Sequence, residues 1–140
     1  MAKVVLDQEF EFDFILLGIS SHVKDYRLCW AVNRSLGLDL VKLEEEIILR
    51  QKNGVDQSTF SIYYYLDNEN ETEFELICNR HEFGYLIPEL KTADYFLKIS
   101  EYFSGSVDEL IQILRKTNLI NMAFEIDVDK LRSKQNLLYL

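Results

Sequence analysis

The chain has 140 residues, of which 48% are hydrophobic, and a net charge of −9 from 24 acidic and 15 basic residues. This length predicts a single domain over residues 1–140, with a core large enough to fold without a disulfide or a structural metal. The acidic balance argues against nucleic-acid binding, which needs clustered Lys and Arg. No apolar run in the sequence approaches the roughly 18 residues of a membrane span, and no secretory signal pattern follows Met1. We therefore expect a cytoplasmic protein without a membrane partner.

Residue types that usually hold metals or perform catalysis are scarce. The two histidines, His22 and His81, have no second ligand at metal-site spacing. The two cysteines, Cys29 and Cys78, lie in apolar patterns typical of reduced core thiols. The sequence contains neither a phosphate-binding glycine loop nor a Gly-x-Ser-x-Gly turn. We expect no metal, no cofactor and no catalytic residues of a recognisable type.

The N-terminal part of the chain predicts a strand followed by a helix. An alternating pattern that turns into an uninterrupted apolar run predicts a central strand over residues 12–19. Ser20-Ser21 offers an N-cap for a helix that runs to about Leu36, with Gly37 as its left-handed stop. A stripe at helical spacing predicts that this helix is deeply packed. The stripe consists of Tyr26, Cys29, Trp30, Asn33 and Leu36 and is widened by Leu28 and Val32.

The middle of the chain predicts an antiparallel meander. Residues 47–52 and 58–66 flank Asn53-Gly54, a pair strongly favoured in tight hairpin turns. After a polar loop, the alternation over residues 74–78 predicts a further strand.

The C-terminal part predicts a strand, a helix and a last strand. Residues 95–100 have the composition of a strand. Ser106 and Glu109 form a capping-box pattern, and apolar residues recur at helical spacing behind it, so we expect a helix over residues 106–117. Alternation over residues 119–126 predicts the final strand.

The end of the chain is expected to be a short docking tail over residues 128–140. A short helix is predicted within residues 127–135. The apolar residues Leu137–Leu140 would form a sticky end in water, so we expect them to pack on the sheet or on a second copy.

Together these elements predict an α+β fold with an antiparallel-rich sheet of five to seven strands and two main helices on one face. Similar strand–helix–strand units near both ends suggest a ferredoxin-like or ACT-like plan with an added hairpin. A fold by itself assigns no function.

One candidate ligand site lies where the first strand meets the first helix. The start of a helix presents free N–H groups and a positive dipole end. Basic side chains gather there in an otherwise acidic chain. The candidate anion- or ligand-binding residues are Ser20, Ser21, His22, Lys24 and Arg27. The alternative is that the serines cap the helix and Arg27 pairs with a local carboxylate.

A second candidate site is a short motif around the one proline of the sequence. Ile87-Pro88-Glu89 is followed by three free positions, by Ala93 and then by Asp94-Tyr95. This spacing resembles the signature of a family of uncharacterised bacterial proteins that is named for its motif, IPExxxVDY, with Ala93 where the family has Val. The run from Ser20 to Trp30 also resembles this family, so the resemblance covers most of the chain. It implies a bacterial protein but no activity, because none is established for the family.

The motif has two open interpretations. Pro88 must end a strand or lie at an edge, and Glu89 and Asp94 then lie at the two sides of a turn with unpaired N–H groups. In the first interpretation their carboxylates accept from those groups and fix two strands, with Tyr95 packed and its hydroxyl bonded. In the second, Ile87, Pro88, Glu89, Asp94 and Tyr95 form an exposed recognition surface.

These observations favour a non-catalytic binding or adaptor module whose partner is another protein or a second copy of the chain. The alternative is an ACT-like regulatory domain that binds a small anion or metabolite at the Ser21 helix start. An enzyme of unrecognised type is the third hypothesis.

Overall fold

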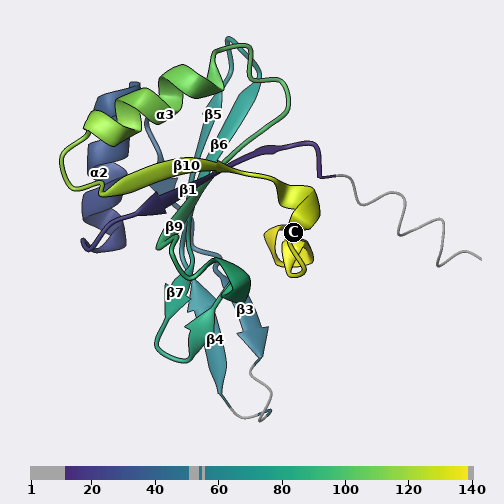
Figure 1. The fold of residues 1–140 in the computed structure, drawn as a ribbon. Helices are drawn as coiled ribbons and strands as arrows, with labels where there is room; N and C mark the ends of the chain where they lie inside the picture. Colours follow the sequence, from purple (N-terminus) through teal and green to yellow (C-terminus); the bar gives the residue numbers. More distant parts are fainter. Residues whose placement is uncertain (1–11, 51–53, 55, 139–140) are drawn as a thin grey trace, which may run out of the picture.

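The computed structural model describes residues 12–50, 54 and 56–138, which form an α+β fold (Figure 1). In chain order its strands and helices are β1 (Ile15–Ser20), α2 (Asp25–Leu36), β2 (Val41–Lys42), β3 (Ile47–Arg50), β4 (Gln57–Phe60), β5 (Ile62–Asp67), β6 (Thr72–Cys78), β7 (Arg80–His81), β8 (Gly84–Tyr85), β9 (Tyr95–Ile99), α3 (Val107–Lys116) and β10 (Met122–Ile126). Three short 3-10 helices cover Pro88–Leu90, Val128–Lys130 and Lys134–Leu137. Over the described ranges, no helix combines the length and the apolar character needed to cross a membrane.

The main sheet has six strands in the order β10-β1-β9-β6-β5-β2, and every neighbouring pair is antiparallel. The pairs β3–β4 and β7–β8 form two separate small ladders. The predicted α+β class and antiparallel sheet are therefore confirmed. The predicted hairpin is confirmed in the antiparallel pairing of β3 with β4, whereas most of its turn, residues 51–53 and 55, lies outside the described residues. The finer ferredoxin-like or ACT-like plan is not confirmed, although the antiparallel pairing of the central neighbours β1 and β9 is compatible with it.

The sheet is covered on both faces. Helices α2 and α3 lie together on one face (Figure 1), where Leu28 and Leu114 pack against Leu17 and Leu97. The opposite face is covered by the β3–β4 hairpin, the motif turn and the C-terminal 3-10 helices. Because successive side chains of a strand point to opposite faces, neighbours such as Leu16 and Leu17 are both fully buried. This double cover explains why β1 is apolar without alternation.

Helix α2 starts later than predicted, and fewer of its side chains are buried than the predicted stripe contains. It begins at Asp25, with Lys24 at the N-cap position, whereas Ser20 and Ser21 belong to the end of β1 and the loop after it. Its end at Gly37 is confirmed, since that glycine adopts φ 68° and ψ 38°. The expected deep packing of Tyr26 and Trp30 is wrong.

These two aromatic side chains are each 61% exposed, while Leu28, Cys29, Ala31 and Val32 are buried. The predicted burial of Leu28, Cys29 and Val32 is confirmed, and Ala31 is buried in place of Tyr26 and Trp30. Aromatic residues count as apolar in a periodicity, yet they are common at exposed contact surfaces.

Helix α3 is close to its prediction. The hydroxyl of Ser106 accepts a hydrogen bond from the backbone N–H of Glu109 at 3.2 Å, as an N-cap does. The helix ends at Lys116, and the N–H of the C-cap residue Thr117 donates to Leu114 O at 3.0 Å. Buried Ile111 and Leu114 form its inner face.

Three predicted strands have different bounds in the structure. The run 58–66 is divided at Ser61, where the chain leaves the β3–β4 ladder and enters the main sheet. The last strand starts at Met122, because Leu119 adopts a left-handed φ of 81° that interrupts extended backbone. The first strand, predicted over residues 12–19, covers Ile15–Ser20.

The C-terminal segment is docked on the sheet. Its predicted helix is replaced by the two short 3-10 helices, and Leu137 is fully buried in the core of the face opposite α2 and α3. The backbone carbonyl of Leu137 also accepts from Lys98 Nζ at 2.8 Å. Docking is confirmed for Leu137, whereas Tyr139 and Leu140 lie outside the described residues.

Candidate functional site

The motif turn is organised by a buried side chain that the sequence analysis did not single out, Asn79. Its amide nitrogen donates to the carbonyls of Leu90 at 2.9 Å and Ala93 at 2.7 Å, and its amide oxygen accepts from the N–H of Ile87 at 2.8 Å. Asn79 is fully buried at the end of β6, and these bonds hold both sides of the turn. As predicted, Pro88 ends the extended run: Ile87 has φ −119° and ψ 90°, and a 3-10 helix follows.

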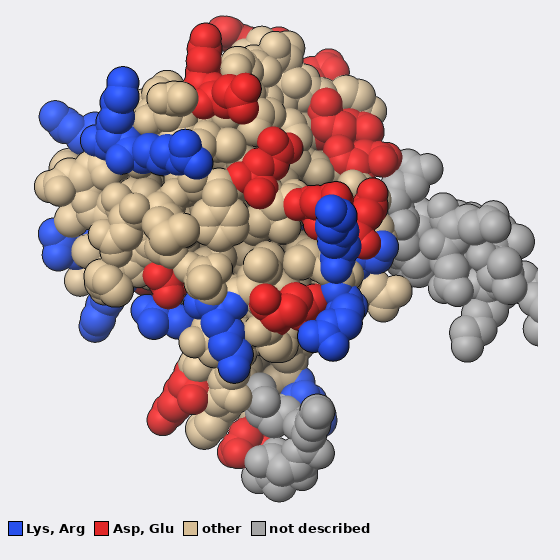
Figure 2. Space-filling model, in the orientation of Figure 1, with Lys and Arg blue, Asp and Glu red and all other residues tan. Residues whose placement is uncertain are grey.

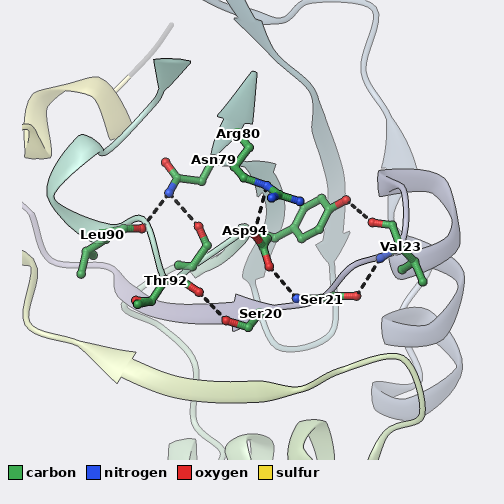
Figure 3. A network of polar contacts seen from close by, with 10 residues as sticks. Ser20, Ser21, Val23, Asn79, Arg80, Leu90, Thr92 and Asp94 are labelled. Atoms are coloured by element: carbon green, nitrogen blue, oxygen red, sulfur yellow. Dashed lines mark hydrogen bonds and ion pairs between the residues drawn. The ribbon is translucent and has the colours of Figure 1, made fainter. Parts of the chain in front are cut away.

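Asp94 connects the turn to the end of β1 (Figure 3). One carboxylate oxygen accepts from the backbone N–H of Ser21 at 2.8 Å, and the other lies 3.0 Å from Arg80 Nε. The Asp94 side chain is largely buried, while that of Arg80 is about half exposed. A buried carboxylate is stabilised when charged donors and backbone N–H groups surround it.

Tyr95 is packed under the start of α2. It is buried, and its hydroxyl donates to the backbone carbonyl of Val23 at 2.7 Å. Burial, with smaller contributions from neighbouring acidic groups, raises the pKa of Tyr95 above its ordinary value. The hydroxyl therefore stays a donor over the physiological pH range.

Glu89 is bonded to the C-terminal segment and not only to its own turn. Its two carboxylate oxygens accept from the backbone N–H and the hydroxyl of Ser133 at 2.8 and 2.9 Å. Burial raises the pKa of Glu89, but these bonds outweigh it, so that the pKa lies below its ordinary value. The carboxylate was expected to accept from N–H groups of its own turn, but it also binds Ser133 in the C-terminal segment, 44 residues along the chain.

The structure brings the two predicted sites together. The Ser20 hydroxyl donates to the carbonyl of Thr92 within the motif turn. The Ser21 hydroxyl donates to the carbonyl of Leu119 at 2.5 Å and accepts from Val23 N–H at 3.4 Å. The Ser21 N–H group that was expected to meet an external anion is bonded to the carboxylate of Asp94 (Figure 3).

A small hollow remains beside this network, with a volume of about 210 Å³. Three basic side chains line it, namely His22, Lys24 and Arg80, together with Cys78 and Tyr95 among others. Burial raises the pKa of the Cys78 thiol to about 12, so this thiol is protonated at neutral pH and is a poor nucleophile. Asp94 also lines this hollow, and its carboxylate pairs there with Arg80.

Arg27, the remaining candidate residue, lies at a different place, beside Trp30. Two adjoining hollows of about 570 and 380 Å³ share Trp30 and Leu119 as lining residues. The first lies between α2 and the C-terminal end of α3, and the second is completed by Tyr26 and Arg27. We refer to the residues that line these two hollows as the Trp30 surface.

Basic and apolar side chains are combined on the Trp30 surface. Arg34 and Lys116 line the larger hollow, and the guanidinium carbon of Arg34 lies 5.5 Å from the centre of the Trp30 ring. Figure 2 shows a group of Lys and Arg side chains on the left, on the side where Figure 1 places the C-terminal end of α3. The sequence did not reveal this surface, because Tyr26 and Trp30 matched a core stripe.

Comparison of the chain with protein-family models, with curated proteins and with solved structures finds no match. Among the described residues, His, Cys, Asp and Glu side chains form no group of three or more that could hold a metal ion. The function is therefore inferred from the geometry of this chain.

Proposed function

We propose that this protein is a non-catalytic binding or adaptor module that contacts a protein partner through the Trp30 surface. The observation that carries the proposal is the exposure of Trp30 and Tyr26, each 61% accessible, on one side of α2. Trp, Tyr and Arg are the residue types that most often dominate binding energy in protein interfaces. Covering a large exposed aromatic side chain removes apolar surface from water, which stabilises the complex with a partner.

In this proposal the motif residues hold the fold together and do not contact the partner. Glu89, Asp94 and Tyr95 are each bonded within the chain, at distances of 2.7 to 3.0 Å. Side chains that are already bonded internally have less capacity for a partner, so the first interpretation of the motif, a clamp, is favoured over a recognition surface. Membership of the bacterial IPExxxVDY family, suggested by the spacing of Ile87-Pro88-Glu89 and Asp94-Tyr95, and a cytoplasmic location are also part of the proposal.

The second candidate function is regulation by a small anion in the hollow lined by His22, Lys24 and Arg80. The cluster of three basic side chains favours it. Against it, Asp94 already places a carboxylate in the same hollow and pairs with Arg80. An ACT-like ligand would compete with this internal anion, so the protein-binding proposal has the better support.

The test is a pull-down with matched variants as bait. Trp30→Ala should abolish or strongly weaken capture of the partner, while Tyr102→Ala should retain it. Tyr102 is 67% exposed and lies just after β9, so it is a matched exposed aromatic outside the Trp30 surface. Equal capture by both variants would refute the role of the Trp30 surface. Light scattering on the purified protein would show whether the partner is a second copy.

A further inference from the structure

We propose, building on the protein-binding function above, that the Trp30 surface takes an acidic segment of a partner protein with a large apolar side chain among its carboxylates. The apolar side chain would enter the groove beside Trp30, and the carboxylates would meet the basic side chains around it. This occupant follows from three properties of the surface, which are its shape, its charge and its backbone geometry.

The shape of the Trp30 surface favours a partner that inserts a side chain. Trp30 separates two hollows, and Leu119 lines both of them. Ile113 adds a further exposed apolar side chain to the larger hollow. A groove with an aromatic wall and apolar neighbours gains most from a bulky apolar group that displaces water from both sides of the ring.

The charge calls for an acidic partner. Arg27, Arg34 and Lys116 line the two hollows, and no carboxylate among the described residues does so. This is unusual in a chain with 24 acidic and 15 basic residues. Complementary charge at an interface steers encounter and excludes partners of the same sign. A nucleic acid fits less well, because a long polyanion would be repelled by the net charge of −9.

The backbone geometry provides a fixed groove. Leu119 has a φ of 81°, a strained conformation for a residue with a branched side chain. The hydroxyl of Ser21 donates to its carbonyl at 2.5 Å, and Ser21 is itself held by Asp94. Local strain that surrounding bonds maintain is often found at binding sites. A groove fixed before binding has less conformational entropy to lose when the segment docks.

The test uses a short fluorescein-labelled peptide that alternates Phe and Leu with Asp and Glu and contains no Trp. Because Trp30 is the one tryptophan of the chain, its emission reports directly on this surface. Binding should shift that emission to shorter wavelength and raise the anisotropy of the labelled peptide. Trp30→Ala should weaken the binding seen by anisotropy about 30-fold, the effect of losing an interface hot spot.

Charge variants test the acidic character of the partner. Arg34→Gln and Lys116→Gln should each weaken binding about threefold, and higher salt should weaken it further. Lys130→Gln is the matched control, since Lys130 is strongly exposed but lies in the 3-10 helix after β10. It should bind the peptide as the wild type does. Melting curves of all variants confirm that they are folded.

Three results would overturn the inference. They are equal binding of a peptide with Asn and Gln in place of the acids, failure of the acidic peptide to bind, and displacement of the peptide by a single-stranded oligonucleotide. None of them would by itself refute the protein-binding function, which fails only if Trp30→Ala retains its partner in the pull-down. The two proposals are therefore distinguishable.

Discussion

At the scale of single residues, Asn79 and Asp94 show how few polar side chains are needed to define the motif turn. Asn79 uses its side-chain donor and acceptor on three different backbone groups, and Asp94 joins the end of β1 to Arg80. Buried polar groups must be bonded. The bonds of Asn79 span 8 to 14 residues of the chain, whereas the bond from Ser21 to Asp94 spans 73. The sequence identified Asp94 from its position after the turn. It could not identify Asn79, because nothing local distinguishes this asparagine from one in a solvated loop.

Glu89 gives a prediction about pH. Its pKa in the folded protein lies below the ordinary value of 4.5, so the folded state binds fewer protons than the unfolded chain as acid is added. The contribution of Glu89 to stability is therefore fully present above pH 4.5 and is lost as the pH falls through the lower folded-state pKa.

Glu89→Gln should accordingly destabilise the protein by about 1 kcal/mol near neutral pH, since charge-assisted bonds to Ser133 are weakened. The difference from the wild type should shrink as the pH falls below 4.5. Urea unfolding at a series of pH values measures both quantities. A difference that is constant with pH would mean that the Glu89 charge does not stabilise the fold.

At the scale of elements, the two helices differ in how well their sequences predict them. Helix α3 carries its own start signal, and its apolar residues face the sheet, so a local pattern was sufficient. For α2 the serines that resemble a cap are used in tertiary bonds to Thr92 and Leu119, and the helix begins at Asp25. Local propensity fails where a side chain has a stronger partner far away in the sequence.

The start of α3 can be tested directly. Ser106→Ala removes the side-chain bond to the N–H of Glu109 and should cost about 1 kcal/mol of stability. Ser104→Ala, at an exposed position before the helix, is the matched control and should change stability little. Chemical denaturation compares the two variants. If Ser106→Ala equals its control, the hydroxyl does not stabilise the helix, and in either case peptide binding at the Trp30 surface should be unchanged.

At the scale of the whole molecule, the sheet has one face covered by helices and one covered by irregular segments. Residues 133–137 connect three separate parts of the second face. Ser133 binds Glu89, the Asn136 amide donates to the carbonyl of Leu86 at 2.8 Å, and Leu137 accepts from Lys98. The apolar pattern of the tail predicted that it docks, but the location depended on contacts that no periodicity encodes.

Leu137 tests whether this C-terminal segment is an integral part of the core. Its side chain is 0% exposed and packs in the same core as Phe60, Ile87 and Phe96, so Leu137→Ala leaves a cavity and should destabilise the protein by about 2–4 kcal/mol.

Leu66→Ala is the control, because Leu66 is 41% exposed and its truncation removes little buried surface. Urea unfolding of both variants gives the comparison, with the dependence of the unfolding free energy on urea concentration fitted as one common value. If Leu137→Ala changes stability no more than Leu66→Ala, the segment does not contribute to the core. If the motif turn and the C-terminal segment unfold as one cooperative unit, the mutation should also weaken the protection of the Ile87 amide against hydrogen exchange.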